Sequence, residues 1–304
     1  MTLVAITGAT GFVGQALIDR ALSAGLEVRA LARSDQSPRP GVTWVKGDLA
    51  NTRALARLMK GAEAVMHVAG VINAPDEAGF EDGNVTGTLT VIEAARKAGV
   101  PRFIFVSSLS AREPRLSAYG ASKAKAEKLV KASGLDWTIV RPPAIYGPRD
   151  REMFELFRIA RWGVLPMPPK QGRASLLHVD DLARLLVALV PQARNTGHKV
   201  FEPDDGKPGG WSHYELARAI GWAVGKRPFV LHLSEQMLRR LAWADARLRA
   251  HKAKLTPDRV GYMCHPDWVV RERARVPLRL WQAQIETRTG LKSTADWYSA
   301  QGWF

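Results

Sequence analysis

Two residues able to do acid–base chemistry lie four positions apart in the segment Tyr119-Gly-Ala-Ser-Lys123. The segment opens an apolar-periodic stretch typical of a helix, and residues at i and i+4 share one helix face. A tyrosine phenol has a reference pKa of about 10, and a neighbouring cation stabilises its phenolate and lowers that pKa. We therefore expect Tyr119 to exchange a proton with a carbonyl or alcohol oxygen, and Lys123 to lower the pKa of its phenol.

A third polar residue, Ser108, follows the apolar run that ends at Val106. From the end of a strand its hydroxyl could donate a hydrogen bond to the same oxygen. Ser107 and Ser110 are alternatives, and the position at the strand end favours Ser108. A Tyr-x-x-x-Lys pair by itself also fits an exposed helix face, so the assignment depends on the elements that position it.

The first of these elements is the N-terminal stretch. The apolar run Leu3–Ile6 predicts a buried strand, and the glycines Gly8, Gly11 and Gly14 lead from it into an apolar-periodic helix. The unpaired amides and the dipole at such a helix N-terminus attract phosphate. A strand turning through glycines into a helix therefore predicts a bound dinucleotide.

The second predicted strand covers residues 26–32, and the residues that follow it indicate which dinucleotide binds. An acidic residue at this place grips a ribose 2′-hydroxyl, whereas an arginine pairs with a 2′-phosphate. Arg33 and Ser34 follow the strand directly, and Asp35 comes later and remains a rival. We expect NADP(H) to be favoured, with NAD(H) possible.

Further strands and helices alternate along the chain. Predicted strands cover 42–49, 64–70 and 137–140, and a long helix covers 81–98. A further strand follows the Gly99-Val-Pro101 turn and ends in Val106-Ser-Ser108. This alternation indicates a parallel sheet with helices on both faces, which binds ligands at the carboxyl ends of its strands. His67 is expected to be a half-buried strand residue, because nothing near it in sequence would orient it for catalysis.

The combined motifs resemble the extended short-chain dehydrogenase/reductase (NAD(P)-dependent epimerase/dehydratase-like) family. The motifs that carry the resemblance are Thr7-Gly-Ala-Thr-Gly-Phe-Val-Gly14, Asp48-Leu49, Asn84, Val106-Ser-Ser108, Tyr119 with Lys123, and Arg141-Pro-Pro-Ala-Ile-Tyr-Gly-Pro148.

The resemblance implies several residue roles. Lys123 would also hold the nicotinamide ribose, and Asn84 would help to order a proton-relay water. Asp48 would contact the adenine, although a strand-end aspartate can equally cap the next helix. Only eleven positions separate Ser108 from Tyr119, fewer than is typical of extended members. Either the pocket is more open, or the C-terminal part covers it.

The expected site combines catalytic and cofactor-binding residues, with no metal. The catalytic set is Ser108, Tyr119, Lys123 and Asn84. The residues expected to contact the dinucleotide are Thr7, Gly8, Thr10, Gly11, Phe12, Val13, Gly14, Arg33, Ser34, Asp48, Leu49, Val68, Ala69, Gly70, Val106, Ser107, Tyr119, Lys123, Pro142, Pro143, Ala144 and Ile145. Arg141 and Tyr146 are expected to be structural.

The fold class is therefore α/β, a Rossmann-type doubly wound parallel sheet with a smaller, mostly helical C-terminal substrate domain. The dinucleotide-binding domain should cover 1–148, with 176–202 returning to it, and the substrate domain 149–175 and 203–304. Asp180 is expected to cap a helix over 181–190, and Ser212 and Glu215 have capping-box spacing. The substrate pocket is expected to be apolar and lined by Phe154, Phe157, Trp162, Leu165 and Met167.

Composition excludes several other classes. The 304 residues carry a formal charge of +15, yet no nucleic-acid-binding motif accompanies the basic residues. One cysteine, Cys264, rules out an internal disulfide and fits a reducing cytoplasm. No signal peptide or transmembrane run is apparent. The apolar stripe Leu238, Leu241, Ala242 and Leu248 is first a packing face, or else a subunit, lid or membrane-surface contact.

Three functional readings follow. The leading one is NADP(H)-dependent reduction of a ketone or aldehyde, or oxidation of the matching alcohol, of an apolar or aromatic small molecule. A nucleotide-sugar epimerase or dehydratase with tightly bound NAD is the second, with Arg158, Arg161 and Arg173 as candidates for holding a diphosphate. A non-catalytic nucleotide-binding subunit of a respiratory complex is the third. A homodimer is possible, because the family commonly dimerises.

Overall fold

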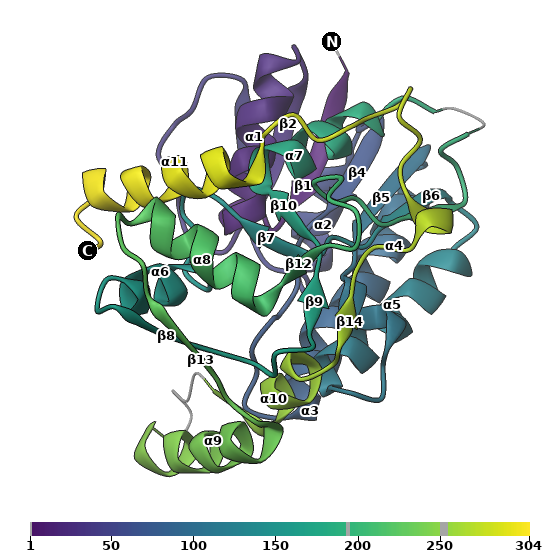
Figure 1. Cartoon of the computed structure of the whole chain (residues 1–304). Helices are drawn as coiled ribbons and strands as arrows, with labels where there is room; N and C mark the ends of the chain where they lie inside the picture. Colours follow the sequence, from purple (N-terminus) through teal and green to yellow (C-terminus); the bar gives the residue numbers. More distant parts are fainter. Residues whose placement is uncertain (1, 193–194, 250–254) are drawn as a thin grey trace. The chain divides into compact units, whose positions relative to one another are not determined.

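A computed structural model describes residues 2–192, 195–249 and 255–304 (Figure 1). The chain divides into two compact units. The first comprises residues 1–142, 182–202 and 276–281, and the second comprises 143–181, 203–275 and 282–304.

The first unit is built on a seven-stranded sheet in the order β11-β6-β5-β4-β1-β2-β3. Every neighbouring pair is parallel. The strands are β1 (Leu3–Thr7), β2 (Glu27–Ala32), β3 (Val42–Lys46), β4 (Ala64–His67), β5 (Arg102–Val106), β6 (Asp136–Val140) and β11 (Lys199–Phe201). Buried Val, Ile, Ala and Phe side chains dominate the central strands, as in a sheet covered on both faces.

Helices cover this sheet, as the alternating pattern predicted. They are α1 (Phe12–Ser23), α2 (Thr52–Met59), α3 (Glu77–Phe80), α4 (Gly87–Lys97), α5 (Ala118–Lys131) and most of α7 (Val179–Ala188). One apolar cluster joins α2, α4 and α5 to the strands. The predicted Rossmann-type sheet is confirmed, with β11 at its edge.

The helix predicted over 81–98 differs from the observed one in its first half. A π-helical turn, Glu81–Thr86, separates α3 from α4. Asn84 lies in this turn, and a π-turn rotates its side chain relative to a regular helix.

The second unit has small sheets and several helices. Its strands are β7 (Ala144–Tyr146), β8 (Val164–Met167), β9 (Arg173–Ala174), β10 (Leu176–His178), β12 (Trp211–Ser212), β13 (Phe229–His232) and β14 (Asp267–Trp268). Its helices are α6 (Phe154–Ala160), α8 (His213–Ala223), α9 (Glu235–Arg249), α10 (Pro257–Met263) and α11 (Thr287–Ala300). The predicted capping box at Ser212 and Glu215 is confirmed and starts α8.

Two expectations about the second unit are wrong. Helix α7 begins at Val179, so Asp180 lies inside its first turn and is not its cap; the Asp180 amide instead donates to Nδ1 of His178 (3.2 Å). The residues expected to line a substrate pocket do not lie together in one pocket wall. Phe157, Leu165 and Met167 are enclosed in the core of the unit, whereas Trp162 is 83% exposed.

Candidate active site

The turn after β1 has the geometry of a phosphate cradle. Gly8 has φ +71°, and a Cβ on it would lie 2.5 Å from the Ala69 amide nitrogen. A Cβ on Gly14 would lie 2.1 Å from the Gly8 carbonyl oxygen. Only glycine fits at both positions. Gly11 precedes α1 without a side-chain cap, so the first amides of the helix face outward at the carboxyl end of β1.

His67, the last residue of β4, is held between β1 and α4 by its two ring nitrogens. Its Nδ1 lies 2.6 Å from the Thr7 hydroxyl and its Nε2 lies 3.0 Å from the Thr88 hydroxyl. The imidazole is completely buried, and burial together with the nearby Lys123 ammonium lowers its pKa to about 3. His67 is thus a neutral structural residue. His67 is a strand residue as expected, but the expectation of half burial is wrong, and its two hydrogen-bond partners are both distant in sequence.

The loop after β3 is held by side-chain oxygens. Asp48 Oδ1 accepts from the amides of Ala50 and Asn51 (both 3.0 Å), and Asn51 caps α2 through the Ala54 amide. The carbonyl of Leu49 accepts from the Thr90 hydroxyl (2.6 Å). Asp48 therefore shapes the loop but is not the helix cap.

Arg33, Ser34 and Asp35 all follow β2 and are exposed. The Asp35 carboxylate accepts from Lys46 Nζ (2.8 Å), at the end of the neighbouring strand β3. Within the described residues, Arg33 forms no ion pair and its guanidinium is open to solvent. Asp35 thus has a counter-ion, while Arg33 has none in the part of the chain that the structure describes.

Ser108 and Tyr119 come together at the carboxyl end of β5. Their side chains are hydrogen-bonded, and Ser108 also caps a 3-10 turn, Leu109–Arg112. Ser107, by contrast, is buried and donates to Glu127 Oε1 (2.7 Å). Ser108, rather than Ser107, therefore shares the site with Tyr119.

The phenol of Tyr119 is neutral at physiological pH. Burial raises its pKa above the ordinary value, and the hydrogen bond with Ser108 lowers it in part. The net direction is opposite to the lowering predicted from the Lys123 cation. A neutral phenol is the form that can donate a proton to a substrate oxygen.

Lys123 is buried beneath this pair. Its ammonium donates to the Val106 carbonyl (2.8 Å) and lies 4.4 Å from the centre of the Phe105 ring. Burial lowers its pKa to about 8, and the Glu127 carboxylate acts in the opposite direction. At neutral pH most of the population therefore carries the charge.

Asn84 connects the loop after β4 to α5. Its Oδ1 accepts from the Val71 amide (2.7 Å), and its Nδ2 donates to the Val71 carbonyl and the Ser122 hydroxyl (both 2.9 Å). A Cβ on Gly70 would lie 3.1 Å from Asn84 Oδ1 and 3.6 Å from Lys123 Nζ. The side chain of Asn84 thus has a positioning role beside Lys123.

A buried ionic network next to Lys123 is not predicted by the sequence pattern. The Glu127 carboxylate accepts both Nε and an Nη of Arg141 (2.7 Å each), and Arg141 reaches Glu202 (3.4 Å). Arg112 also pairs with Glu202 (3.4 Å). The sequence signal for this network is the position of Glu127, which stands one turn after Lys123 on the face that carries Tyr119.

The remaining expected cofactor residues lie on two units. Thr10, Phe12 and Val13 lie in or next to the glycine turn, and Val68 to Gly70 follow β4. Pro142 ends the first segment of the first unit, and its carbonyl accepts from the Leu109 amide (3.1 Å). Pro143, Ala144 and Ile145 belong to the second unit. Tyr146 is fully buried there and donates to the Thr287 carbonyl (3.4 Å), in keeping with a structural role.

The family follows from this fold, the glycine cradle and comparisons with known proteins. A family model described as NAD(P)H-binding matches residues 8–190. Ceramide reductase of Caulobacter vibrioides is 39% identical over 99% of this chain and 96% of its own length. The 2-alkyl-3-oxoalkanoate reductase of Stenotrophomonas maltophilia is 29% identical over 90% of this chain and 92% of its own.

Solved structures agree on the fold. UDP-glucuronic acid 4-epimerase of Bacillus cereus superposes with a TM-score of 0.77 at 18% identity, covering 99% of each chain. The chain belongs to the extended short-chain dehydrogenase/reductase family, and it is an NAD(P)-dependent oxidoreductase.

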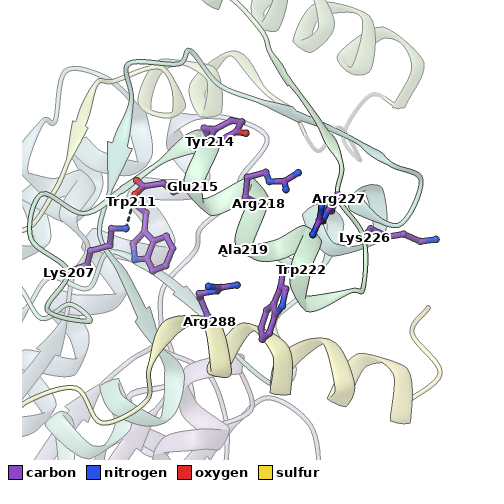
Figure 2. Close-up of a pocket in the computed structure, with 10 residues that line it drawn as sticks. All are labelled: Lys207, Trp211, Tyr214, Glu215, Arg218, Ala219, Trp222, Lys226, Arg227 and Arg288. Atoms are coloured by element: carbon purple, nitrogen blue, oxygen red, sulfur yellow. Dashed lines mark hydrogen bonds and ion pairs between the residues drawn. The ribbon is translucent and has the colours of Figure 1, made fainter.

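The second unit holds a separate hollow of about 490 Å³ between α8, the segment after it and α11 (Figure 2). It is lined by Lys207, Trp211, Tyr214, Glu215, Arg218, Ala219, Trp222, Lys226, Arg227 and Arg288. None of these residues belongs to the predicted catalytic or dinucleotide-binding sets.

Proposed function

We propose that the chain is an NADP(H)-dependent carbonyl reductase acting on an apolar, lipid-like ketone, with Tyr119 as the proton donor. The observation that carries the proposal is the hydrogen-bonded pair of Ser108 and Tyr119 at the end of β5, with the Lys123 cation buried beside it. A neutral donor, a second hydroxyl and a fixed positive charge are the groups that carbonyl reduction requires from a protein.

Each side chain has one task in this reaction. The nicotinamide, when bound, supplies the hydride that reaches the carbonyl carbon. Tyr119 donates its proton to the carbonyl oxygen, and Ser108 donates a hydrogen bond to the same oxygen. The phenolate left on Tyr119 is stabilised by the Lys123 ammonium until a proton from water restores the phenol. Asn84 keeps the loop after β4 in place against α5.

The first unit has the features needed to hold the dinucleotide. The Gly8–Gly14 cradle gives backbone access to a pyrophosphate at the N-terminus of α1. Arg33 supports the NADP(H) preference, because it is exposed and forms no ion pair among the described residues, while the Asp35 carboxylate pairs with Lys46.

The substrate class rests on the relatives rather than on the predicted apolar lining. Ceramide reductase is 39% identical over 99% of this chain, and its name refers to ceramide, a long-chain lipid amide. The arginines considered for a sugar-nucleotide diphosphate already have partners in their own unit. Arg158 pairs with Glu155 (2.6 Å), Arg161 covers the Phe304 ring, and Arg173 donates to the carbonyls of Gly209 and Gly210.

The test is a substrate panel with the purified chain. We expect NADPH oxidation with a long-chain keto amide that exceeds the rate with NADH, and no conversion of UDP-glucose. Interconversion of UDP-sugars, together with NAD released on denaturation, would instead establish the epimerase reading. Turnover of neither substrate class would contradict the proposal.

A further inference from the structure

Helix α9 exposes an apolar stripe that is separate from its packing face. Leu238 and Ala242 are buried against Leu233 and Val260, as the predicted packing face requires. Met237, Leu241 and Leu248, at positions i, i+4 and i+11, share another side and are 47%, 48% and 85% exposed. Of the predicted stripe, Leu241 and Leu248 are thus exposed. A continuous exposed apolar stripe marks an interaction site.

Cations border this stripe. Arg240 and Arg247 are exposed, lie beside the stripe on the helix, and have no carboxylate partner among the described residues. Arg247 covers the ring of Trp243 (4.1 Å), which is itself 59% exposed. Leucines on one side, with arginines and a tryptophan at their border, are typical of a helix that lies in a membrane interface.

The strand pair that leads into α9 also exposes apolar side chains. Phe229 and Leu231 on β13 are 68% and 42% exposed, and Val164 on β8, in register with Phe229, is 44% exposed. Leu233, the residue after β13, packs in the same small core as Leu238 of α9. The two elements are therefore adjacent within one unit (Figure 1).

The hollow of Figure 2 adds a cationic site next to β13. Arg218, Lys226, Arg227 and Arg288 line it, and none forms an ion pair within the described residues. Glu215, the one carboxylate of the lining, is already paired with Lys207 (2.9 Å). Four unbalanced cations repel one another, so a bound anion would stabilise the arrangement. Arg227 stands two residues before Phe229, which joins the hollow to the apolar strands.

We propose that this surface of the second unit docks on an anionic lipid membrane. The exposed side chains of α9 and β13 lie at the boundary of headgroups and acyl chains, and the hollow receives lipid phosphate. Cations next to each apolar segment favour a phospholipid surface over an apolar protein partner. The net charge of +15 adds long-range attraction to such a membrane. The inference goes beyond the proposed reaction, because it does not depend on Tyr119.

Vesicle flotation of the full chain tests the proposal. Vesicles of phosphatidylcholine alone are compared with vesicles containing about 30% phosphatidylglycerol. We expect at least about tenfold stronger binding to the anionic vesicles, and a loss of about tenfold in the variant Leu241→Glu/Leu248→Glu. Arg227→Ala/Arg240→Ala should weaken binding to anionic vesicles and reduce its salt dependence.

A matched control separates membrane docking from general stickiness. Leu278 belongs to the first unit and is 78% exposed, so Leu278→Glu should bind vesicles as the wild type does. All variants should keep wild-type circular dichroism and wild-type turnover of a water-soluble carbonyl. Wild-type protein that does not float with anionic vesicles would overturn the proposal and point to a protein partner. Equal flotation of Leu241→Glu/Leu248→Glu and wild type would overturn it as well.

Discussion

Glu127 lies one helical turn after Lys123 on the buried face of α5 and counteracts the effect of burial on the Lys123 ammonium. Burial lowers the pKa of Lys123 to about 8, while the carboxylate raises it. The same carboxylate holds Arg141 and the hydroxyl of Ser107, so its position is fixed by several hydrogen bonds. The Lys123–Glu127 pair therefore sets the pH range in which Lys123, beside Tyr119, carries its positive charge.

The first prediction concerns this pair. Glu127→Gln removes the charge that supports the ammonium, so the pKa of Lys123 falls further. The alkaline limb of kcat/KM, expected near pH 8 in the wild type, should move down by about one pH unit. Glu81→Gln is the control, because Glu81 pairs with the exposed Lys125. An unmoved limb in Glu127→Gln would show that Lys123 does not set it.

The second prediction concerns stability in acid. The folded-state pKa of His67 is about 3, below its value of 6.5 in an unfolded chain, so the unfolded state binds more protons in between. Its contribution is fully present above pH 6.5 and is lost as the pH falls toward 3. The wild type should lose about 3 kcal/mol through this group between about pH 7 and pH 4. His67→Gln should show a correspondingly shallower loss in urea unfolding, and parallel curves would contradict the assignment.

The third prediction uses two glycines of the same turn. A Cβ at position 14 would lie 2.1 Å from the Gly8 carbonyl, and a Cβ at position 11 would lie 3.3 Å from that same oxygen. Gly14→Ala should therefore cost about 2 kcal/mol or more of unfolding free energy, and Gly11→Ala much less. Urea denaturation of both variants measures this. Equal destabilisation would mean that the close approach of α1 to β1 does not limit position 14.

The fourth prediction concerns the coenzyme. Arg33→Ala should raise the Kd of NADPH about tenfold or more and change that of NADH little, because only NADPH carries the 2′-phosphate. Titration of protein fluorescence measures both constants. Arg96→Ala, another exposed arginine of the first unit, serves as the control. An equal effect of Arg33→Ala on the two coenzymes would remove the basis for NADP(H) preference.

The parallel sheet and the glycine turn could be predicted because both depend on local sequence. Apolar runs define β1, β5 and β6, and a glycine at position 14 is needed wherever a helix packs this closely on a strand. Ser108 and Tyr119 could be paired as well, since the carboxyl end of a strand and the following helix meet at one edge of the sheet.

Other features depend on contacts between distant segments. His67 contacts Thr7 and Thr88, and Arg141 pairs with Glu127 and Glu202, only after the sheet has assembled. The net pKa of Tyr119 likewise depends on its burial, which spacing alone does not reveal. Apolar spacing also does not separate a pocket wall from a core, so it predicts a pocket wall where Phe157 and Leu165 in fact lie in the core.

The role of Tyr119 is tested most directly by single-turnover oxidation of NADPH in the presence of a keto amide. We expect Tyr119→Phe to slow this step by about 100-fold or more while leaving NADPH affinity unchanged. Ser108→Ala, which removes one hydrogen bond, should slow it by about tenfold or more. If Tyr119→Phe oxidises NADPH at the wild-type rate, the proton comes from another group and the proposed mechanism is wrong.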